Sequence, residues 1–345
     1  FPGSHLAPIT HHNGRSSGVV ALTSTVDNNR TAMPLVMLLV ALFFFSIQDV
    51  VISDLTKRYP VHEIVFVRSL VNIWPLILLS FAFDQGKNMQ VTKFWYLFLR
   101  GGLLSLSYTC YYLALAGLDF AQATALYFTA PLFITFLSWV TTRVPIGWRR
   151  LTGVLVGFIG VLFIVKPGAG DIPLLPAMMA VGSAFFYSLS ALMTNWLGRT
   201  ESTTVQSITF VIMNLFFGAV FWAVFGDGWA VDKAPEGLEV LLKAWVWPTR
   251  NDVLIMVGIG LGSALGFIML TAAYRNLEPS FAAPFEYCLM GYNLLWGILL
   301  FRQYPDALTL TGIAIIVCSG LFVLYREGER RQSIVRRLFR PRRVR

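Results

Sequence analysis

Long apolar segments alternate with short polar breaks along the chain from Met33 to Arg326. A helix needs about 20 apolar residues to cross the hydrocarbon core of a bilayer. The pattern therefore predicts ten membrane-spanning helices. They cover residues 33–53, 61–83, 93–116, 120–141, 148–166, 173–196, 203–225, 252–274, 279–301 and 307–326.

The breaks between these helices contain residues that favour turns. Arg58-Tyr59-Pro60 and Lys166-Pro167-Gly168 are examples, and only the connection at 226–251 is long. Residues 1–32 are rich in Ser, Thr, Gly and Asn without periodicity, so we expect a disordered N-terminal tail. Residues 327–345 are expected to form a basic cytoplasmic tail.

The composition agrees with this pattern. The chain is 56% hydrophobic and only 13% charged, whereas soluble domains are about 45–50% apolar and about 25% charged. This composition excludes a disordered chain, a disulfide scaffold and an ordinary cytosolic enzyme. We therefore expect an all-α polytopic membrane protein. The three cysteines lie inside apolar runs without metal-ligand spacing, so neither a disulfide nor a metal site is expected.

The distribution of Lys and Arg predicts the orientation of the chain. With the N-terminus inside, the inner segments hold 18 of the 27 basic residues and the outer loops hold 7, while Arg68 and Arg100 fall inside helices. Nine of the inner residues are arginines between Arg326 and Arg345. Both termini are therefore predicted on the cytoplasmic side of an inner (plasma) membrane, with the tail near anionic lipid. No recognition module accompanies the tail, so we expect no nucleic-acid partner.

The two halves of the chain resemble each other weakly but in register. Moving residues 114–165 by 159 positions places Leu151-Thr152-Gly153 on Leu310-Thr311-Gly312 without a gap. A second shift, by 141 positions, places Phe44-Phe45 on Phe185-Phe186. These matches indicate an internal repeat.

Each repeat contains five of the predicted helices, the first at residues 33–166 and the second at 173–326. Because five is odd, the second repeat enters the membrane from the opposite side. The expected fold is therefore ten transmembrane helices arranged as two inverted five-helix repeats, an architecture found in many secondary transporters.

Five segments carry a resemblance to a known family. They are Tyr59–Arg68, Leu99–Gly102, Ala125–Pro131, Pro284–Tyr287 and Leu324–Glu327. In order and spacing they resemble the drug/metabolite transporter superfamily, specifically its EamA-domain group with two five-helix repeats. The resemblance implies a carrier for an organic metabolite such as an amino acid, riboflavin or S-adenosylmethionine.

The chain departs from the pattern of that family at the end of two helices. Phe301-Arg302-Gln303 stands where the family commonly has Gly-Glu, and Thr142-Arg143 is a similar departure in the first repeat. Because both lie at helix ends, we expect altered loop contacts rather than loss of transport.

Four ionisable residues stand out inside the predicted helices: Asp49, Arg68, Arg100 and Glu286. A charge at the bilayer centre costs at least about 2.5–3.5 kcal/mol, so such residues are functional candidates. Asp49 and Arg68 lie at similar depths and suit an ion pair, and Arg100 and Glu286 suit a second pair. The alternative is that these pairs only hold helices together. Glu286 is the preferred functional candidate because Pro284 opens the helix ladder beside it.

Polar and aromatic residues extend this set. Asn72 lies one helical turn after Arg68, and we expect Tyr111, Tyr127 and Tyr287 to line a central cavity. Aromatic rings around a polar centre suit a flat or cationic organic molecule. Two groups of glycines at small-xxx-small spacing are expected to let helices pack closely. They are Gly153, Gly157 and Gly160, and Gly258, Gly262 and Gly266.

These observations predict a secondary-active transporter that moves a small organic metabolite by alternating access. Glu286 is the expected site for a proton or a substrate amine, and proton coupling is a hypothesis that rests on Glu286 alone. Arg68 and Arg100 are expected to bind anionic groups or to act in gating. The alternative function is a lipid or lipid-linked flippase or scramblase of the same superfamily. The sequence has no phosphate-binding loop and no catalytic grouping, so we expect neither an enzyme nor a cofactor.

Overall fold

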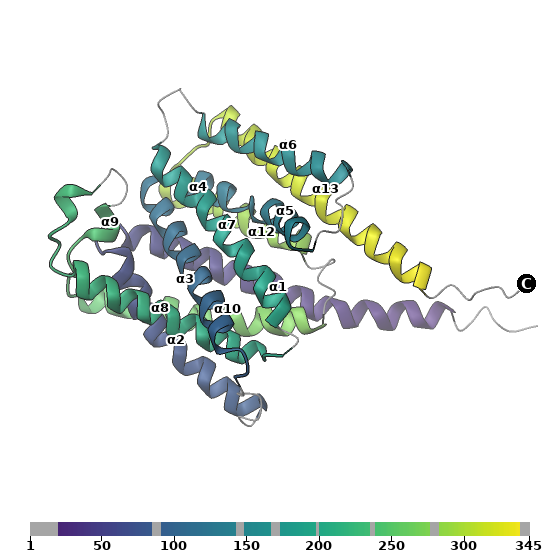
Figure 1. Ribbon diagram of the computed structural model, residues 1–345, viewed down its shortest axis with the longest axis horizontal. Coiled ribbons are helices and arrows are strands. Elements are labelled where there is room, and N and C mark those ends of the chain that lie inside the picture. Colours follow the sequence, from purple (N-terminus) through teal and green to yellow (C-terminus); the bar gives the residue numbers. More distant parts are fainter. Residues whose placement is uncertain are drawn as a thin grey trace, which may run out of the picture.

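The computed structural model describes residues 20–84, 91–142, 148–166, 173–197, 200–234, 239–276 and 283–338, which contain helices and no strand (Figure 1). The first half contains α1 (Val20–Leu55), α2 (Val61–Asp84), α3 (Phe94–Gly117), α4 (Phe120–Tyr127), α5 (Ala130–Thr142) and α6 (Trp148–Val165). The second half contains α7 (Leu174–Leu197), α8 (Thr203–Phe225), η1 (Val231–Lys233), α9 (Glu239–Leu242), α10 (Arg250–Asn276), η2 (Ala283–Glu286), α12 (Tyr287–Phe301) and α13 (Ala307–Leu338).

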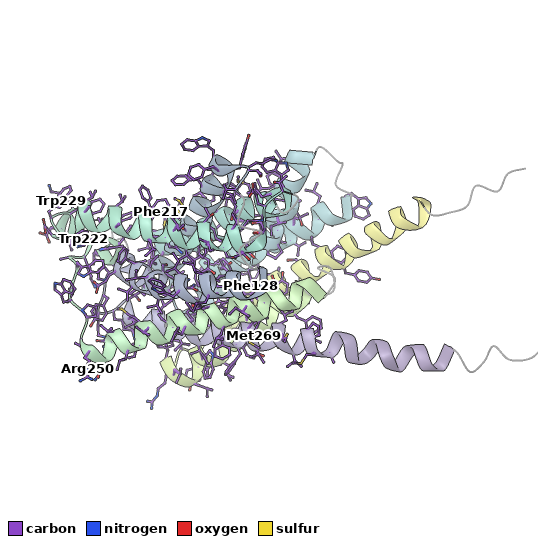
Figure 2. The ribbon with its side chains drawn as sticks, turned by 90° about the horizontal axis from the view of Figure 1, so that it is seen from below. Phe128, Phe217, Trp222, Trp229, Arg250 and Met269 are labelled. Carbon is purple, nitrogen blue, oxygen red and sulfur yellow. The ribbon has the colours of Figure 1, made fainter. Side chains whose placement is uncertain are left out.

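Many of these helices have the length and composition of membrane spans. Six described segments are long and apolar enough to cross a bilayer: Ala32–Leu55, Val61–Leu78, Phe120–Leu137, Leu174–Thr194, Thr204–Phe225 and Arg250–Leu270. Shorter apolar helices cover Leu151–Val165, Tyr287–Phe301 and Ala307–Val323. Large apolar side chains project outward from the bundle, as Figure 2 shows for Trp222. The chain is therefore an all-α, multi-pass membrane protein.

Helices extend into both segments that the sequence predicts as tails. α1 begins at Val20, so residues 20–32 are helical rather than disordered, and α13 continues to Leu338 within the basic segment. Extending an existing helix adds one hydrogen bond per residue without a new nucleation step, which explains how each membrane helix continues into a polar segment. The remaining tail residues, 1–19 and 339–345, lie outside the described residues.

The helix expected at 120–141 is interrupted near its middle. α4 ends at Tyr127 and α5 begins at Ala130, because Pro131 lacks the N–H that would continue the ladder. Other contacts surround this break in the ladder. The Thr129 backbone N–H and hydroxyl both donate to the Leu126 carbonyl, at 3.2 and 2.7 Å, and the Ser188 hydroxyl of α7 lies 2.7 Å from the Ala184 carbonyl and 3.0 Å from the Ala130 carbonyl.

The helix expected at 279–301 is interrupted as well. Its described part consists of the 3-10 turn η2, which contains Pro284, followed by α12 from Tyr287. Residues 279–282 lie outside the described residues. The 159-residue shift moves η2 onto residues 124–127, so the two interruptions fall at matching places in the two halves.

The two ends of the bundle differ in their packing. α1 begins and α13 ends at the same end, on the right in Figures 1 and 2, which we call the proximal face. The opposite end, where residues 56–60 and 302–306 lie, is the distal face. The largest cluster of buried apolar residues includes Ile52, Leu55 and Phe120 and fills the distal half.

Glycines set the spacing of one helix pair. α6 and α13 lie against each other, and a Cβ atom on Gly160 would come within 2.9 Å of the Gly312 carbonyl oxygen. The expected role of α6 glycines in close packing is thus visible in the structure. On α10 the expectation is wrong for Gly258, where an added Cβ atom would meet no heavy atom of the described residues within 4 Å. Gly260 instead faces Val71, at 2.8 Å from such a Cβ atom.

Gly160→Ala is expected to destabilise the protein by about 1–3 kcal/mol, because the new methyl group meets a backbone atom that a rotamer change cannot remove. Gly258→Ala is the matched control, since it adds a methyl group in open space on another apolar helix. Thermal unfolding in detergent micelles measures both. Equal melting temperatures for the two variants would contradict close packing at Gly160.

Arg302 adopts a backbone conformation that favours glycine. It caps the C-terminus of α12 with φ 54° and ψ 29°. A side chain in this left-handed region costs about 1–2 kcal/mol because Cβ crowds the following carbonyl. Arg302 therefore carries backbone strain, while the helix C-cap geometry is retained.

Arg302→Gly is expected to stabilise the protein by about 1 kcal/mol by removing this strain. Arg302→Ala removes the same charge but keeps a Cβ atom, so it should leave stability nearly unchanged. The same unfolding measurement separates the two. Equal gains for Gly and Ala would show that the charge, rather than the backbone, limits stability.

Candidate functional site

A cavity of about 370 Å³ lies at the centre of the bundle and in its proximal half. This volume falls within the range of about 300–1,000 Å³ that is usual for small-molecule sites. Both halves of the chain line it. Its wall includes Phe45, Asp49, Arg100, Tyr108, Tyr111, Tyr127, Phe128, Pro131, Tyr187, Thr194, Phe267 and Glu286.

Charged side chains stand at different depths of this cavity. Arg100 lies in the proximal half of α3, whereas Asp49 lies at the deep end next to the distal apolar cluster. At 1.5 Å per residue, Arg100 and Tyr111 are separated by about 16 Å along the axis of α3. Glu286 lies between these ends, at the interruption before α12.

Arg100 is held by the second half of the chain. Its Nε atom donates to Thr194 Oγ1 at 2.9 Å and its Nη1 atom donates to the Gln206 carbonyl at 2.7 Å. Both of these acceptors are neutral oxygens, and neither belongs to Glu286. The structure thus places Arg100 and Glu286 in the wall of one cavity, while Thr194 and the Gln206 carbonyl hold the guanidinium of Arg100.

Asp49 is buried at a junction of four helices. Its Oδ2 atom accepts hydrogen bonds from the Tyr111 hydroxyl at 3.3 Å and from Asn293 Nδ2 at 3.1 Å. Asn293 Nδ2 also donates to Thr124 Oγ1 at 3.1 Å. Because these residues come from α1, α3, α4 and α12, the carboxyl group connects both halves of the chain.

Arg68 shares this region but does not contact Asp49 directly. Its Nη1 atom donates to the Tyr112 hydroxyl, and its guanidinium lies over the rings of Tyr108 and Tyr112, 5.4 and 5.8 Å from their centroids. None of the ion pairs among the described residues joins it to Asp49. A layer of tyrosines therefore separates the two charges that the sequence suggested as a pair.

Two further candidates lie behind the cavity wall. Asn72 and Tyr287 are buried, and neither is among the residues that line the cavity. The Tyr287 hydroxyl points toward Gly320 of α13 instead. Tyr111 and Tyr127 do line the cavity, with ring centroids 5.0 Å apart.

Sequence reasoning missed the cavity residues of α7. Ser183, Tyr187, Ser190 and Thr194 all line the cavity, and the Tyr127 and Tyr187 ring centroids are 5.7 Å apart. These residues recur every three or four positions on an otherwise apolar helix. That spacing was the available signal, because it places polar side chains on one helical face.

Comparison with known proteins identifies the family. Residues 32–166 match the EamA-like transporter family. An S-adenosylmethionine uptake transporter of Rickettsia bellii is 26% identical over 84% of this chain and 92% of its own length. Residues 32–166 therefore carry an EamA-like transporter domain of the drug/metabolite transporter type.

Other relatives of this EamA-like transporter carry different names. A riboflavin transporter of Vibrio cholerae is 30% identical over 59% of this chain and 61% of its own length. A pseudopaline exporter of Pseudomonas aeruginosa is 27% identical over 81% of this chain and 91% of its own length. One solved crystal structure covers 87% of this chain and 98% of its own chain with a TM-score of 0.58 at 16% identity, which shows a shared fold.

Polar contacts tie the distal face of the transporter together. The Phe120 backbone N–H donates to Gln303 Oε1 at 3.0 Å, which joins the start of α4 to the end of α12. Lys166 pairs with Asp306 at 2.8 Å. The hydrogen bonds from Lys166 and Thr309 lower the pKa of Asp306 to about 2. Gln303 therefore serves as a hydrogen-bond acceptor at the end of α12.

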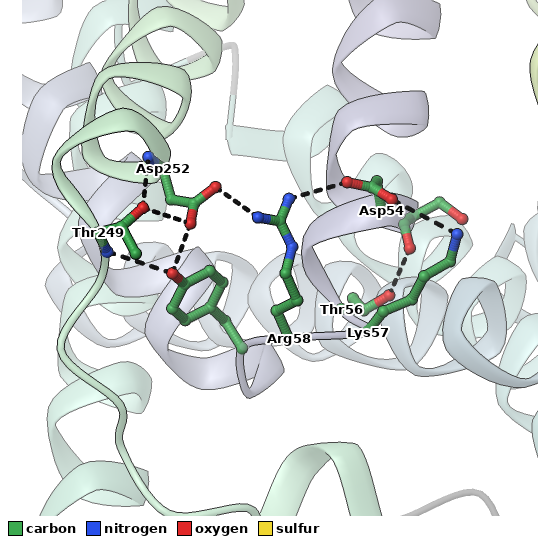
Figure 3. A network of polar contacts seen from close by, with 8 residues as sticks. Asp54, Thr56, Lys57, Arg58, Thr249 and Asp252 are labelled. Carbon is green, nitrogen blue, oxygen red and sulfur yellow. Dashed lines mark hydrogen bonds and ion pairs between the residues drawn. The ribbon is translucent and has the colours of Figure 1, made fainter.

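A second distal contact joins the α1–α2 connection to α10 (Figure 3). Arg58 bridges Asp54 at 2.9 Å and Asp252 at 2.8 Å, and the Tyr59 hydroxyl donates to Asp252 at 2.7 Å. Asp252 also accepts from the Thr249 hydroxyl at 2.7 Å at the start of α10. We call these residues the distal latch.

The proximal face has a matching contact, which we call the proximal latch. Glu201, between α7 and α8, accepts hydrogen bonds from the Lys93 backbone N–H at 2.8 Å and from the backbone N–H and hydroxyl of Thr92. Partial burial alone would raise the pKa of Glu201, but the hydrogen bonds from Thr92 and Lys93 outweigh it and leave this pKa below its usual value. The 159-residue shift places Lys93 on Asp252, so the two latches occupy related positions. At this position the distal latch has the acceptor, Asp252, whereas the proximal latch has a donor, the Lys93 backbone N–H.

The proximal latch predicts a pH effect on stability. Because the folded pKa of Glu201 is depressed, its contribution is complete above the unfolded value of about 4.3 and is lost as the pH falls through the lower folded value. Glu201→Gln should melt at a lower temperature than wild type at neutral pH, and the difference should shrink below about pH 4. Melting curves against pH in detergent test this. A difference that does not change with pH would contradict an ionised Glu201.

Proposed function

We propose that this EamA-like transporter moves a small organic metabolite across the membrane by alternating access. The observation that carries this proposal is the central cavity, because residues from both halves line it and it holds acidic, basic and aromatic side chains. The distal half is filled by apolar residues, whereas the cavity occupies the centre and the proximal half. This asymmetry fits one of the two states of an alternating-access cycle.

We further propose ten membrane crossings arranged as inverted repeats at 33–166 and 173–326. The helix contacts support this, since the most extensive of them have counterparts when the halves are exchanged. The α1–α10 contact corresponds to α7–α3, and the α1–α12 contact corresponds to α7–α5. In the same way, α2 packs on α8 and α6 packs on α13, which are pairs of equivalent helices. The matching interruptions at α4–α5 and η2–α12 agree with the exchange.

The proposed location is an inner (plasma) membrane with both termini in the cytoplasm. The common position of the start of α1 and the end of α13 supports an even number of crossings. The arginines between Arg326 and Arg345 support placing that end inside, next to anionic lipid. In this orientation the cavity lies toward the cytoplasm and the distal latch lies at the outer face.

The cargo that suits this cavity is a metabolite with a flat ring and charged ends. Tyr108, Tyr111, Tyr127 and Tyr187 offer ring faces for stacking or for a cation. Arg100 suits an anionic group and Glu286 suits an amine or another cation, at different depths of one site. The relatives named for S-adenosylmethionine and for riboflavin support a cargo that contains a planar heterocycle.

Purified protein in liposomes tests the function. A thermal-shift screen of amino acids, nucleosides, polyamines and carboxylates extends the candidate cargoes beyond S-adenosylmethionine and riboflavin. We expect at least one radiolabelled compound from this set to accumulate inside the liposomes to a higher level than in vesicles without protein. Movement of fluorescent lipid without uptake of any water-soluble compound would overturn the proposal in favour of a flippase or scramblase.

Glu286→Gln tests the cation site. Loss of a charge-assisted contact of about 1.5–3 kcal/mol should weaken binding of cationic S-adenosylmethionine by about 10–100-fold, and binding of neutral riboflavin should change little. The matched control is Glu239→Gln, an exposed acid in α9 outside the cavity. Equal losses for the cationic and neutral compounds would contradict a charge-specific role for Glu286.

A further inference from the structure

Asp49 is less exposed to solvent than Glu286, the other acidic residue in the cavity wall. Only 6% of it is exposed, whereas Glu286 is half-buried. The two hydrogen bonds that it accepts, from Tyr111 and Asn293, come from neutral groups. Arg68, the cation of the same region, donates to the Tyr112 hydroxyl and makes cation–π contacts with two tyrosine rings.

A carboxylate in such a position is costly to keep ionised. Two neutral hydrogen bonds offset only part of the free energy of removing a charge from water, and no ion pair among the described residues includes Asp49. Binding a proton makes the carboxyl group neutral and removes most of this desolvation cost. Glu286, with more solvent around it, can keep its charge for a substrate cation.

Resting on the proposed transport function, we propose that Asp49 rather than Glu286 binds the proton that is coupled to cargo movement. In the state described here the carboxyl group is protonated. On release the O–H bond breaks, its electron pair stays on the carboxylate, and the proton passes to water in the cavity. No oxidant or co-reactant takes part.

The position of Asp49 explains how its proton would affect the whole protein. Asp49 on α1, Tyr111 on α3, Thr124 on α4 and Asn293 on α12 meet there, so the carboxyl group touches both repeats at the deep end of the cavity. Ionisation would strengthen the attraction to Arg68 on α2, a helix that packs mainly against α8 and α10. A proton at this point therefore biases which face is closed.

The surroundings contain few other groups that titrate. Arg68 comes from α2 and Glu286 from η2, while α10 faces the cavity with Phe267 and Leu270. The α3 groups near Asp49 are tyrosines, which stay neutral at physiological pH. They are Tyr108, Tyr111 and Tyr112.

Infrared difference spectroscopy of the full chain in liposomes tests the assignment without any cargo. Between about pH 5 and about pH 9, wild type should show a carbonyl stretch of a protonated carboxylic acid that disappears as the pH rises. The band should be weaker in Asp49→Asn and undiminished in Glu286→Gln, and the comparison is with wild type because the buried Glu63 can contribute to the band in every variant. Asp54→Asn, an exposed aspartate at the distal end of the same helix, is the matched control and should leave the band undiminished. An undiminished band in Asp49→Asn would overturn the proposal.

A second variant covers the case in which Asp49→Asn does not fold. Tyr111→Phe keeps the ring but removes one donor to the carboxylate, so the midpoint of the band should move up by about one pH unit. Tyr292→Phe, a tyrosine of α12 whose ring packs on Phe43, is its control and should leave the midpoint in place. An unchanged midpoint in Tyr111→Phe would place the protonated acid elsewhere.

Transport separates failure of this inference from failure of the proposed function. In liposomes loaded with a pH-sensitive dye, we expect riboflavin or S-adenosylmethionine to drive proton movement in wild type and in Glu239→Gln, whose exposed acid lies outside the cavity, but not in Asp49→Asn. Coupled proton movement in Asp49→Asn would overturn the role of Asp49. Absence of any uptake, with the infrared band assigned to Asp49, would overturn the transport function and leave a proton site without that role.

Discussion

The need of a backbone in lipid to satisfy its own hydrogen bonds is the constraint on which this structure depends. It explains why the described chain is helical, and it makes the two interruptions informative. At α4–α5 the Leu126 carbonyl accepts from Thr129 and the Ala130 carbonyl lies next to the Ser188 hydroxyl of α7, and residues of this segment line the cavity. An interruption is tolerated where protein or cavity water replaces the missing partners. The place where the helices break is therefore the place where a cargo can reach polar groups.

The same constraint governs the buried charges. Arg68 and Asp49 are too costly to leave without partners, yet they are not paired with each other. Tyrosine hydroxyls and rings stabilise the cation, while Tyr111 and Asn293 donate to the acid. Separating the charges by neutral groups keeps each available for a change of partner, whereas a direct ion pair would hold one arrangement. Arg100 differs because Thr194 and the Gln206 carbonyl fix its position on the cavity wall.

Contacts at the two faces of the bundle complete this picture. The distal latch joins the α1–α2 connection to α10, and the proximal latch joins the α7–α8 connection to α3. Each latch thus joins a hairpin of one half to a helix of the other, with the acid on α10 in one case and on the connection in the other. Both are present in one state, so the opening of either face must involve other elements, such as the α4 and α12 ends that Gln303 joins at the distal face.

The sequence by itself determined the class of the protein. Apolar segments of membrane length and scarce charge follow from composition and order, because lipid imposes the same demand on every crossing. The sequence also singled out Asp49, Arg68, Arg100 and Glu286, since charge is rare where it is expensive. Only the tertiary structure decided their partners. Whether Arg68 meets Asp49 or Tyr112, and whether Tyr287 faces the cavity or Gly320, depends on helix rotation and tilt. Those quantities are set by packing across the two halves, between residues far apart in the chain, which no local pattern encodes.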